Sequence, residues 1–247
     1  MITKKELEEY AKIKGFQNLG YSEKDYFQNI ILFILSKEYG KEIVFKGGTA
    51  LSKCFGLNRF SEDLDFDCEK EIEFKKLNES LKRFKIDFKI SEKKYKSSVH
   101  WIIKIKGPLY IGIKNSICKI LLDISLREKV ILKPEIKNIG RFMEELPSFD
   151  ILVMKEEEIF AEKIRTIMTR NKARDVYDLD FLIKRNIKFN KKLVNEKLKY
   201  YGKKWNKKEF VKELNNKKNI WDSELKNLIE NVPKFNEIKK NILQNIK

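Results

Sequence analysis

A short apolar segment that runs directly into two glycines constrains the fold more than any other feature of the sequence. Residues 42–45 read Glu-Ile-Val-Phe, and residues 46–49, Lys-Gly-Gly-Thr, follow at once. The apolar run predicts a short buried strand, and residues 50–55 predict a helix entered straight from the glycine turn. Paired glycines there let the backbone approach a phosphate, which the free N–H groups at the start of the helix can bind. The same pair also fits plain turn chemistry that needs no ligand.

Asp63 and Asp65 lie in a second strand-like segment, residues 63–67. Residues i and i+2 of a strand point to the same face, so both carboxylates converge while the apolar residues between them turn inward. Two carboxylates this close repel each other unless a cation neutralises them. Mg²⁺ is commonly bound through one or two carboxylates plus substrate phosphates. The pattern predicts a magnesium site, with an exposed acidic strand edge as the alternative, and we expect Asp67 to be solvated beyond the strand.

Asp123 supplies a third carboxylate inside an otherwise apolar strand-like segment, residues 118–126. A lone buried Asp is destabilising without a partner. The context therefore favours a metal-site role over a capping or turn role. A two-metal site of this kind can activate an attacking oxygen and stabilise a leaving pyrophosphate.

The remaining periodicity divides the chain into two parts. Residues 4–14, 22–39 and 69–84 predict helices, residues 85–90, 99–106 and 118–126 predict strands, and the pattern from residue 155 onward is helical. We place a boundary near Ser148 to Lys155, with an α/β domain over residues 1–150 and a basic helical domain over residues 151–247. The expected fold class is α/β (α+β), a mixed β-sheet flanked by helices and followed by a C-terminal helical bundle.

The chain is strongly basic, with a formal net charge of +17. Residues 181–247 contain 19 Lys or Arg against 7 acidic residues. Such a balance favours nucleic-acid or other polyanionic partners. Because Lys far outnumbers Arg, the coding bias of an AT-rich genome is an equally acceptable explanation.

Several classes of protein are excluded or disfavoured. No apolar run approaches the roughly 18 residues that cross a bilayer, and the charged N-terminus does not resemble a secretory signal. The three cysteines form neither a metal-ligand spacing nor an even disulfide set, which suits a reducing cytoplasm. The single histidine, His100, rules out zinc sites built on two or three histidines.

Two segments carry a family resemblance. Residues 47–51, Gly-Gly-Thr-Ala-Leu, and residues 59–66, Arg-Phe-Ser-Glu-Asp-Leu-Asp-Phe, resemble the AbiEii/AbiGii-type toxin family of nucleotidyltransferases, in the superfamily that contains DNA polymerase β. The resemblance implies Mg²⁺-dependent transfer of a nucleoside monophosphate from an NTP, with release of pyrophosphate. It also implies that Asp63 and Asp65 hold the metals and that Asp123 completes the site and is the candidate base for the attacking hydroxyl.

A later block supports the same resemblance. It contains Lys163, then Arg170, then Arg-Asp-x-Tyr-Asp-Leu over residues 174–179. Lys163 and Arg170 are seven residues apart, so on one helix they share a face and can both meet a triphosphate. Asp175 fits a helix cap equally well, and Asp178 can pair with Lys163 or Arg170 to hold the basic group.

These arguments give one set of predicted site residues. The predicted metal ligands are Asp63, Asp65 and Asp123; the predicted catalytic residues are these three and Lys163; and the predicted nucleotide-binding residues are Gly47, Gly48, Thr49, Lys163, Arg170 and Asp178. For His100 and Trp205 we favour structural roles, although His100 can line the cleft and Trp205 can stack on a base within a basic surface.

The resemblance further implies the toxin half of a toxin–antitoxin or phage-defence pair, with a cognate antitoxin. It suggests an RNA acceptor, with the 3′ end of tRNA as the leading candidate, bound electrostatically by the basic C-terminal part. Two alternatives stay open: a non-catalytic RNA-binding protein on a degenerate transferase fold, and a transferase that modifies a protein hydroxyl.

Overall fold

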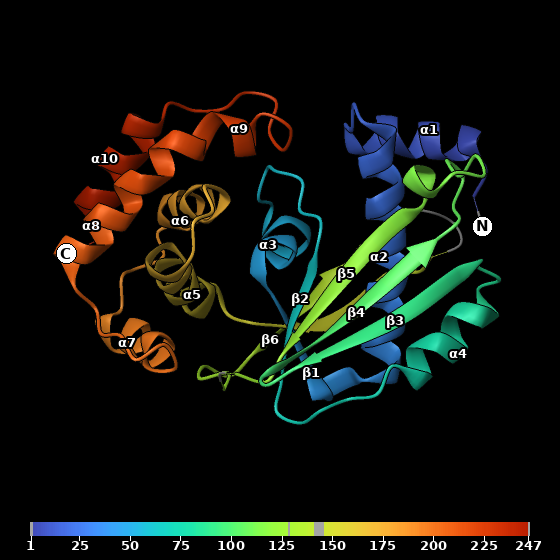
Figure 1. Cartoon of the computed structure of the whole chain (residues 1–247), viewed down its shortest axis with the longest axis horizontal. Coiled ribbons are helices and arrows are strands. Elements are labelled where there is room, and N and C mark those ends of the chain that lie inside the picture. Colours follow the sequence, from blue (N-terminus) through green and yellow to red (C-terminus); the bar gives the residue numbers. More distant parts are fainter. Residues whose placement is uncertain (1, 128, 141–145, 247) are drawn as a thin grey trace. The chain divides into compact units, whose positions relative to one another are not determined.

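The chain forms two compact units in the computed structural model, which describes residues 2–127, 129–140 and 146–246 (Figure 1). The sheet unit comprises Met1–Ala50, Glu62–Lys129 and Glu135–Val153, and the helical unit comprises Leu51–Ser61, Val130–Pro134 and Met154–Lys247. Each unit therefore combines several stretches of chain. The division into domains at residues 150 and 151 stays a prediction.

A single mixed sheet organises the sheet unit. Among the described residues it has seven strands in the order β3-β4-β5-β2-β1-β7-β6. The strands are β1 (Ile43–Lys46), β2 (Leu64–Cys68), β3 (Phe88–Tyr95), β4 (Ser98–Ile105), β5 (Cys118–Ser125), β6 (Glu135–Ile139) and β7 (Phe149–Val153). β2 runs parallel to β5 and β1 runs parallel to β7, whereas the other neighbouring pairs are antiparallel. This mixed α/β architecture confirms the predicted fold class.

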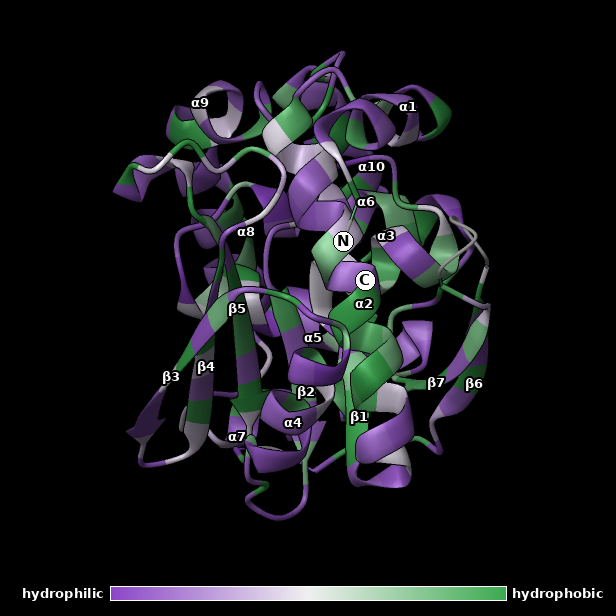
Figure 2. Ribbon diagram, turned by 90° about the vertical axis from the view of Figure 1, so that its right-hand side faces the viewer, coloured by the Kyte–Doolittle hydropathy of each residue, from purple (hydrophilic) through white to green (hydrophobic). Residues whose placement is uncertain are grey.

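Helices pack on the sheet through apolar side chains. The sheet unit contains α1 (Lys4–Lys14), α2 (Leu19–Glu38) and α4 (Lys75–Arg83), while α3 (Gly47–Phe55) starts in the sheet unit and ends in the helical unit. α2, which is predominantly hydrophobic in Figure 2, packs against β5 and β7. Its Phe33 ring lies edge-on to Phe149 of β7 at 5.6 Å. Burial of this apolar face stabilises the sheet unit.

The central strands separate apolar from polar side chains. Leu64 and Phe66 of β2 are buried, as are Leu122 of β5 and Trp101 of β4. The alternate positions of the same strands carry carboxylates and a histidine, because successive side chains of a strand point to opposite faces. The inward direction predicted for the apolar residues of β2 is confirmed, and so is the core position predicted for Trp101.

The helical unit is built around α5, whose residues Glu158–Met168 are all buried. α5 packs against α6, α7 and α8, and α6 packs against α9 and α10. The helices are α5 (Glu156–Thr169), α6 (Arg174–Lys184), α7 (Lys191–Lys199), α8 (Lys207–Asn216), α9 (Trp221–Leu225) and α10 (Phe235–Asn245). Trp205 lies just before the Asn206 cap of α8 and contacts Phe210 one turn later at 5.2 Å. This contact is a hydrophobic staple, which accords with the structural role favoured for Trp205.

One expected element differs from the structure, and two strands were not predicted. The helix expected over residues 69–84 begins only at Lys75. β6 was not predicted, because only its last residue, Ile139, is buried and its alternation is mostly of charged and half-exposed residues. β7 falls on the boundary expected near residues 148–155. Among the described residues, no helix has both the length and the apolar character that a membrane span requires.

Candidate active site

The junction between β1 and α3 is shaped by Gly47. Its φ of +76° lies in the left-handed region that disfavours residues with a side chain. A Cβ at this position would also overlap a carboxylate oxygen of Asp65. The glycine pair was interpreted as allowing close approach of a phosphate, but in this structure the space beside Gly47 admits the Asp65 carboxylate.

A row of polar residues crosses four strands beside this junction. Lys46 of β1 is the register partner of Asp65 on β2, Asp65 is the partner of Asp123 on β5, and Asp123 is the partner of His100 on β4. Side chains directly opposite each other on neighbouring strands share a face. The sheet therefore brings Asp65 and Asp123 together, although they are 58 positions apart in the sequence.

Asp123 lies close to two basic side chains, but one of its carboxylate oxygens accepts no hydrogen bond from the described residues. His100 Nε2 lies 3.4 Å from Asp123 Oδ1, and Arg127 Nη2 lies 3.9 Å from Oδ2. Asp123 Oδ1 is buried and accepts no hydrogen bond within the part of the chain that the structure describes. A buried carboxylate oxygen in that state is stabilised by an additional cation.

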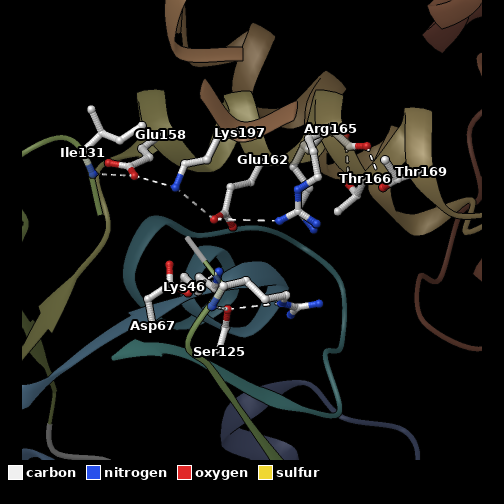
Figure 3. A network of polar contacts seen from close by, with 12 residues as sticks. Lys46, Asp67, Ser125, Ile131, Glu158, Glu162, Arg165, Thr166, Thr169 and Lys197 are labelled. Atoms are coloured by element: carbon white, nitrogen blue, oxygen red, sulfur yellow. Dashed lines mark hydrogen bonds and ion pairs between the residues drawn. The ribbon is translucent and has the colours of Figure 1, made fainter. Parts of the chain in front are cut away.

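Lys46 and Asp67 form a buried ion pair on the same face as Asp65 (Figure 3). Lys46 Nζ lies 2.7 Å from Asp67 Oδ1, and the two residues are 6% and 2% exposed. The prediction that Asp67 is solvated beyond the strand was wrong. The alternation of apolar residues continues through Cys68, so Asp67 is an interior residue of β2.

Asp63 and Thr49 are arranged differently from the simplest interpretation of the sequence. Asp63 precedes β2, which begins at Leu64, so it is not a strand residue. Its backbone carbonyl accepts a hydrogen bond from the Thr49 hydroxyl of α3. The Thr49 hydroxyl is thereby engaged in holding the entry to β2 beside the glycine turn.

The residues around Asp65 and Asp123 fit a magnesium ion by their chemistry. Among the described residues no three His, Cys, Asp or Glu side chains gather closely enough to form a metal site by themselves. Mg²⁺ is nevertheless usually held by one or two carboxylates, with substrate phosphates and water as the other ligands. Two cross-strand carboxylates, one with a buried oxygen that lacks a hydrogen bond, match that pattern.

The helical unit contains a separate cluster of buried charges. Lys163 Nζ of α5 lies 3.0 Å from Asp175 Oδ1 and 2.7 Å from Asp178 Oδ2, both on α6. Arg59 Nε and Nη2 donate to the two oxygens of Asp178 at 2.6 and 2.7 Å. Arg170 Nε and Nη2 donate to the two oxygens of Asp175 at 2.7 and 2.8 Å. The cluster joins three of the predicted nucleotide-binding residues, Lys163, Arg170 and Asp178.

Both aspartates of this cluster are fully buried and stay ionised. Burial by itself raises the pKa of Asp178, but the charges of Arg59 and Lys163 outweigh it and hold that pKa below its ordinary value. Burial likewise opposes ionisation of Asp175, and Lys163 and Arg170 lower its pKa. Asp175 therefore does more than cap α6, and Arg170, the first residue after α5, has an exposed side chain.

Sequence reasoning did not identify Lys46, Arg127, or the contact of His100 with Asp123. The contacts of Lys46 and His100 depend on strand pairing and register, whereas Arg127 lies only four residues after Asp123. One signal was present: Lys46 directly precedes the glycine pair at the end of an apolar strand, where a lone cation needs a partner. The site residues proposed from the sequence are thus found in two groups, one on the sheet and one in the helical unit.

Solved structures with the same fold include nucleotidyltransferases. MenT4, a nucleotidyltransferase toxin from Mycobacterium tuberculosis H37Rv, is 19% identical with a TM-score of 0.68, covering 99% of this chain and 88% of that one. JHP933 from Helicobacter pylori is 24% identical with a TM-score of 0.61, covering 92% and 89%. A Helicobacter pylori protein described as a nucleotidyltransferase is 26% identical with a TM-score of 0.58, covering 89% of each chain.

At the level of sequence, no curated protein matches the chain significantly. The model of the family "Nucleotidyl transferase AbiEii toxin, Type IV TA system" matches residues 31–241. That range includes the glycine turn, the three carboxylates predicted for the metal and the later basic block. The chain belongs to the AbiEii family of nucleotidyltransferase toxins from type IV toxin–antitoxin systems.

Proposed function

We propose that this nucleotidyltransferase transfers a nucleoside monophosphate from an NTP to RNA in a Mg²⁺-dependent reaction, and that the 3′ end of tRNA is the acceptor. The observation that carries the proposal is the cross-strand pair of Asp65 and Asp123 beside the glycine turn. A pair of carboxylates on one face of a sheet is unfavourable unless a cation is shared between them. A triphosphate substrate brings both the need for that cation and its remaining ligands.

In this proposal Asp65 and Asp123 hold the metal, which supplies charge neutralisation for the attacking oxygen and the leaving pyrophosphate. Asp63 is the candidate for a further ligand in a two-metal arrangement. Asp123 also accepts the proton of the attacking hydroxyl, a role that its oxygen without a hydrogen bond supports. His100 and Arg127 position the Asp123 carboxylate.

The backbone of residues 47–49 is the proposed phosphate cradle. Gly47 and Gly48 lack side chains, and Thr49 offers its N–H group in the first turn of α3, where the helix dipole favours an anion. Lys163, Arg170 and Asp178 are the proposed triphosphate-binding group. Among these three, Arg170 has the most exposed side chain and Asp178 acts by holding Lys163.

Modification of RNA would explain how the proposed reaction makes the protein toxic. A toxin that alters the 3′ end of tRNA would stop translation, in keeping with a role in phage defence and with a cognate antitoxin. We expect the protein to act in the cytoplasm, where NTPs, Mg²⁺ and tRNA are available. The charge of residues 181–247 supports a nucleic-acid acceptor over a neutral one.

Label transfer tests this proposal directly. The protein and an Asp65→Asn variant are incubated with Mg²⁺, total RNA and each α-labelled NTP in turn, with EDTA as the metal-free control. We expect label in a tRNA-sized band only with the wild-type protein and Mg²⁺. Label that is lost on protease treatment instead of ribonuclease treatment would reassign the acceptor to a protein hydroxyl. Tight RNA binding with no label in either acceptor would contradict the proposed reaction.

A further inference from the structure

The helical unit has a hollow at the start of α7, which we call the α7 hollow. Its volume is about 710 Å³, and its wall includes residues 186–193 together with Leu132, Lys155 and Glu157. Every lining residue belongs to the helical unit. None of them is among the residues assigned above to catalysis or nucleotide binding.

The charge of the α7 hollow is strongly positive. Lys155, Lys188, Lys191 and Lys192 line it, against one acidic residue, Glu157. None of these four lysines has an ion-pair partner within the described part of the chain, although other lysines of the helical unit do. Lys188, Lys191 and Lys192 are exposed and Lys155 is half-buried. These four lysines, which have no ion-pair partner among the described residues, repel one another around the hollow. A bound polyanion would reduce that repulsion.

The wall of the α7 hollow is fixed by buried contacts behind it (Figure 3). Glu158 accepts hydrogen bonds from the backbone N–H groups of Ile131 and Leu132, both at 2.8 Å. Lys197 of α7, which is 1% exposed, lies 2.7 Å from Glu158 and 3.3 Å from Glu162 on α5. These contacts fasten α7 and the segment 130–134 to α5. The backbone that carries Lys191 and Lys192 is therefore held in place, which limits the entropy lost on binding to that of the lysine side chains.

The start of α7 adds a second favourable element. The Asn190 side chain accepts a hydrogen bond from Leu193 N–H, which defines the first turn of the helix. Lys191 and Lys192 occupy that turn, where the helix dipole disfavours cations. Their charges therefore destabilise α7 by itself. An anion bound at this point would be attracted both by the lysines and by the helix dipole.

We propose that the α7 hollow binds the phosphate backbone of single-stranded RNA. A single phosphate is much smaller than a hollow of this volume, whereas successive phosphates of a strand can reach lysines on two chain segments. Phe189 lies in the same wall and supplies a ring on which a base can stack. The inference rests on the proposed function, because it assigns a place on this chain to the RNA acceptor.

Salt-dependent binding of a fluorescein-labelled oligouridylate tests the assignment. All proteins carry Asp65→Asn and are assayed without NTP or Mg²⁺, so that catalysis plays no part. The test variant is Lys188→Ala/Lys191→Ala/Lys192→Ala. The matched control is Lys4→Ala/Lys5→Ala/Lys12→Ala on α1, which removes the same charge from three other exposed lysines. A third variant replaces the three hollow lysines by arginine.

A plot of the logarithm of the association constant against log salt concentration has a negative slope. We expect the test variant to make this slope shallower by about 2, since each phosphate contact on a single strand contributes about 0.7. This corresponds to about 100-fold weaker binding at 0.1 M salt. The α1 control and the arginine variant should keep the wild-type slope. The arginine variant also separates loss of charge from any loss of folding.

Equal slopes for the test variant and the α1 control would overturn the inference, whether or not nucleotide transfer to RNA is observed. A shallower slope in the test variant alone would support the RNA site even if label transfer failed. The two proposals therefore fail by different measurements.

Discussion

The facing carboxylates of the sheet unit and the buried carboxylates of the helical unit have different surroundings. In the helical unit, each of the four carboxylate oxygens of Asp175 and Asp178 accepts from Lys163, Arg59 or Arg170. In the sheet unit, Asp65 on β2 lies directly opposite Asp123 on the neighbouring strand β5. Among the described residues, Asp123 has a buried oxygen without a hydrogen bond. The carboxylates of the helical cluster are satisfied by neighbouring cations, whereas the sheet pair includes a buried oxygen that accepts no hydrogen bond from the described residues and is the proposed metal site. The contrast separates carboxylates that hold cationic side chains in place from carboxylates that we propose to bind a metal.

Asp178→Asn should have the largest effect on stability. It removes the carboxylate from a buried cluster and leaves Arg59 and Lys163 undercompensated, which costs about 3–5 kcal/mol. Because the pKa of Asp178 is lowered in the folded protein, its contribution is fully present above pH ~4, the usual value for an unfolded Asp, and is lost as the pH falls through the folded value. In urea unfolding at pH 7 and 5, the variant should have a lower free energy of unfolding than the wild-type protein. This difference should become smaller at pH 3.

The control for this variant is Asp87→Asn, which breaks the exposed pair with Lys106. Its urea midpoint should stay close to that of the wild-type protein. If Asp178→Asn unfolded at the wild-type urea concentration, the view of this cluster as a structural element would be abandoned.

Asp65→Asn should have the opposite outcome, a large loss of activity with no loss of stability. Loss of a proposed metal ligand should lower nucleotide transfer by about 1,000-fold. Stability should stay the same or rise slightly, because the substitution removes repulsion between Asp65 and Asp123. Transfer is measured with labelled NTP and stability by thermal unfolding, without added metal. A destabilised protein with residual transfer would contradict the distinction between the two units.

Much of this arrangement could be predicted from the sequence, because it depends on local patterns. The apolar strand before Gly47 and the inward Leu64 and Phe66 follow from short-range periodicity. β6 could not be recognised, since an edge strand buries little and its alternation is hidden by charged residues. The contact of His100 with Asp123 could not be recognised either, because the register between β4 and β5 is set by long-range packing.

A double-mutant cycle on Lys46 and Asp67 measures how strongly this buried ion pair of the sheet unit is coupled. Lys46→Met removes the ammonium 2.7 Å from a buried carboxylate and should cost about 3 kcal/mol of unfolding free energy. Adding Asp67→Asn removes the charge that was left behind, so the double variant should regain about 1–2 kcal/mol. The measurement is urea unfolding of the wild-type protein, both single variants and the double variant. Additive losses would mean that the pair is not coupled.

Gly47→Ala should have a modest effect on stability and the most specific effect on the site. Gly15 has nearly the same backbone angle, +71° against +76°, but open space where a Cβ would lie, so Gly15→Ala isolates the backbone strain of about 1–2 kcal/mol. Gly47→Ala adds an overlap with the Asp65 carboxylate. Displacement of that carboxylate should weaken Mg²⁺ binding and raise the Mg²⁺ concentration needed for half-maximal rate about tenfold. Equal Mg²⁺ requirements in the two alanine variants would show that the space beside Gly47 serves the turn alone and not the Asp65 carboxylate.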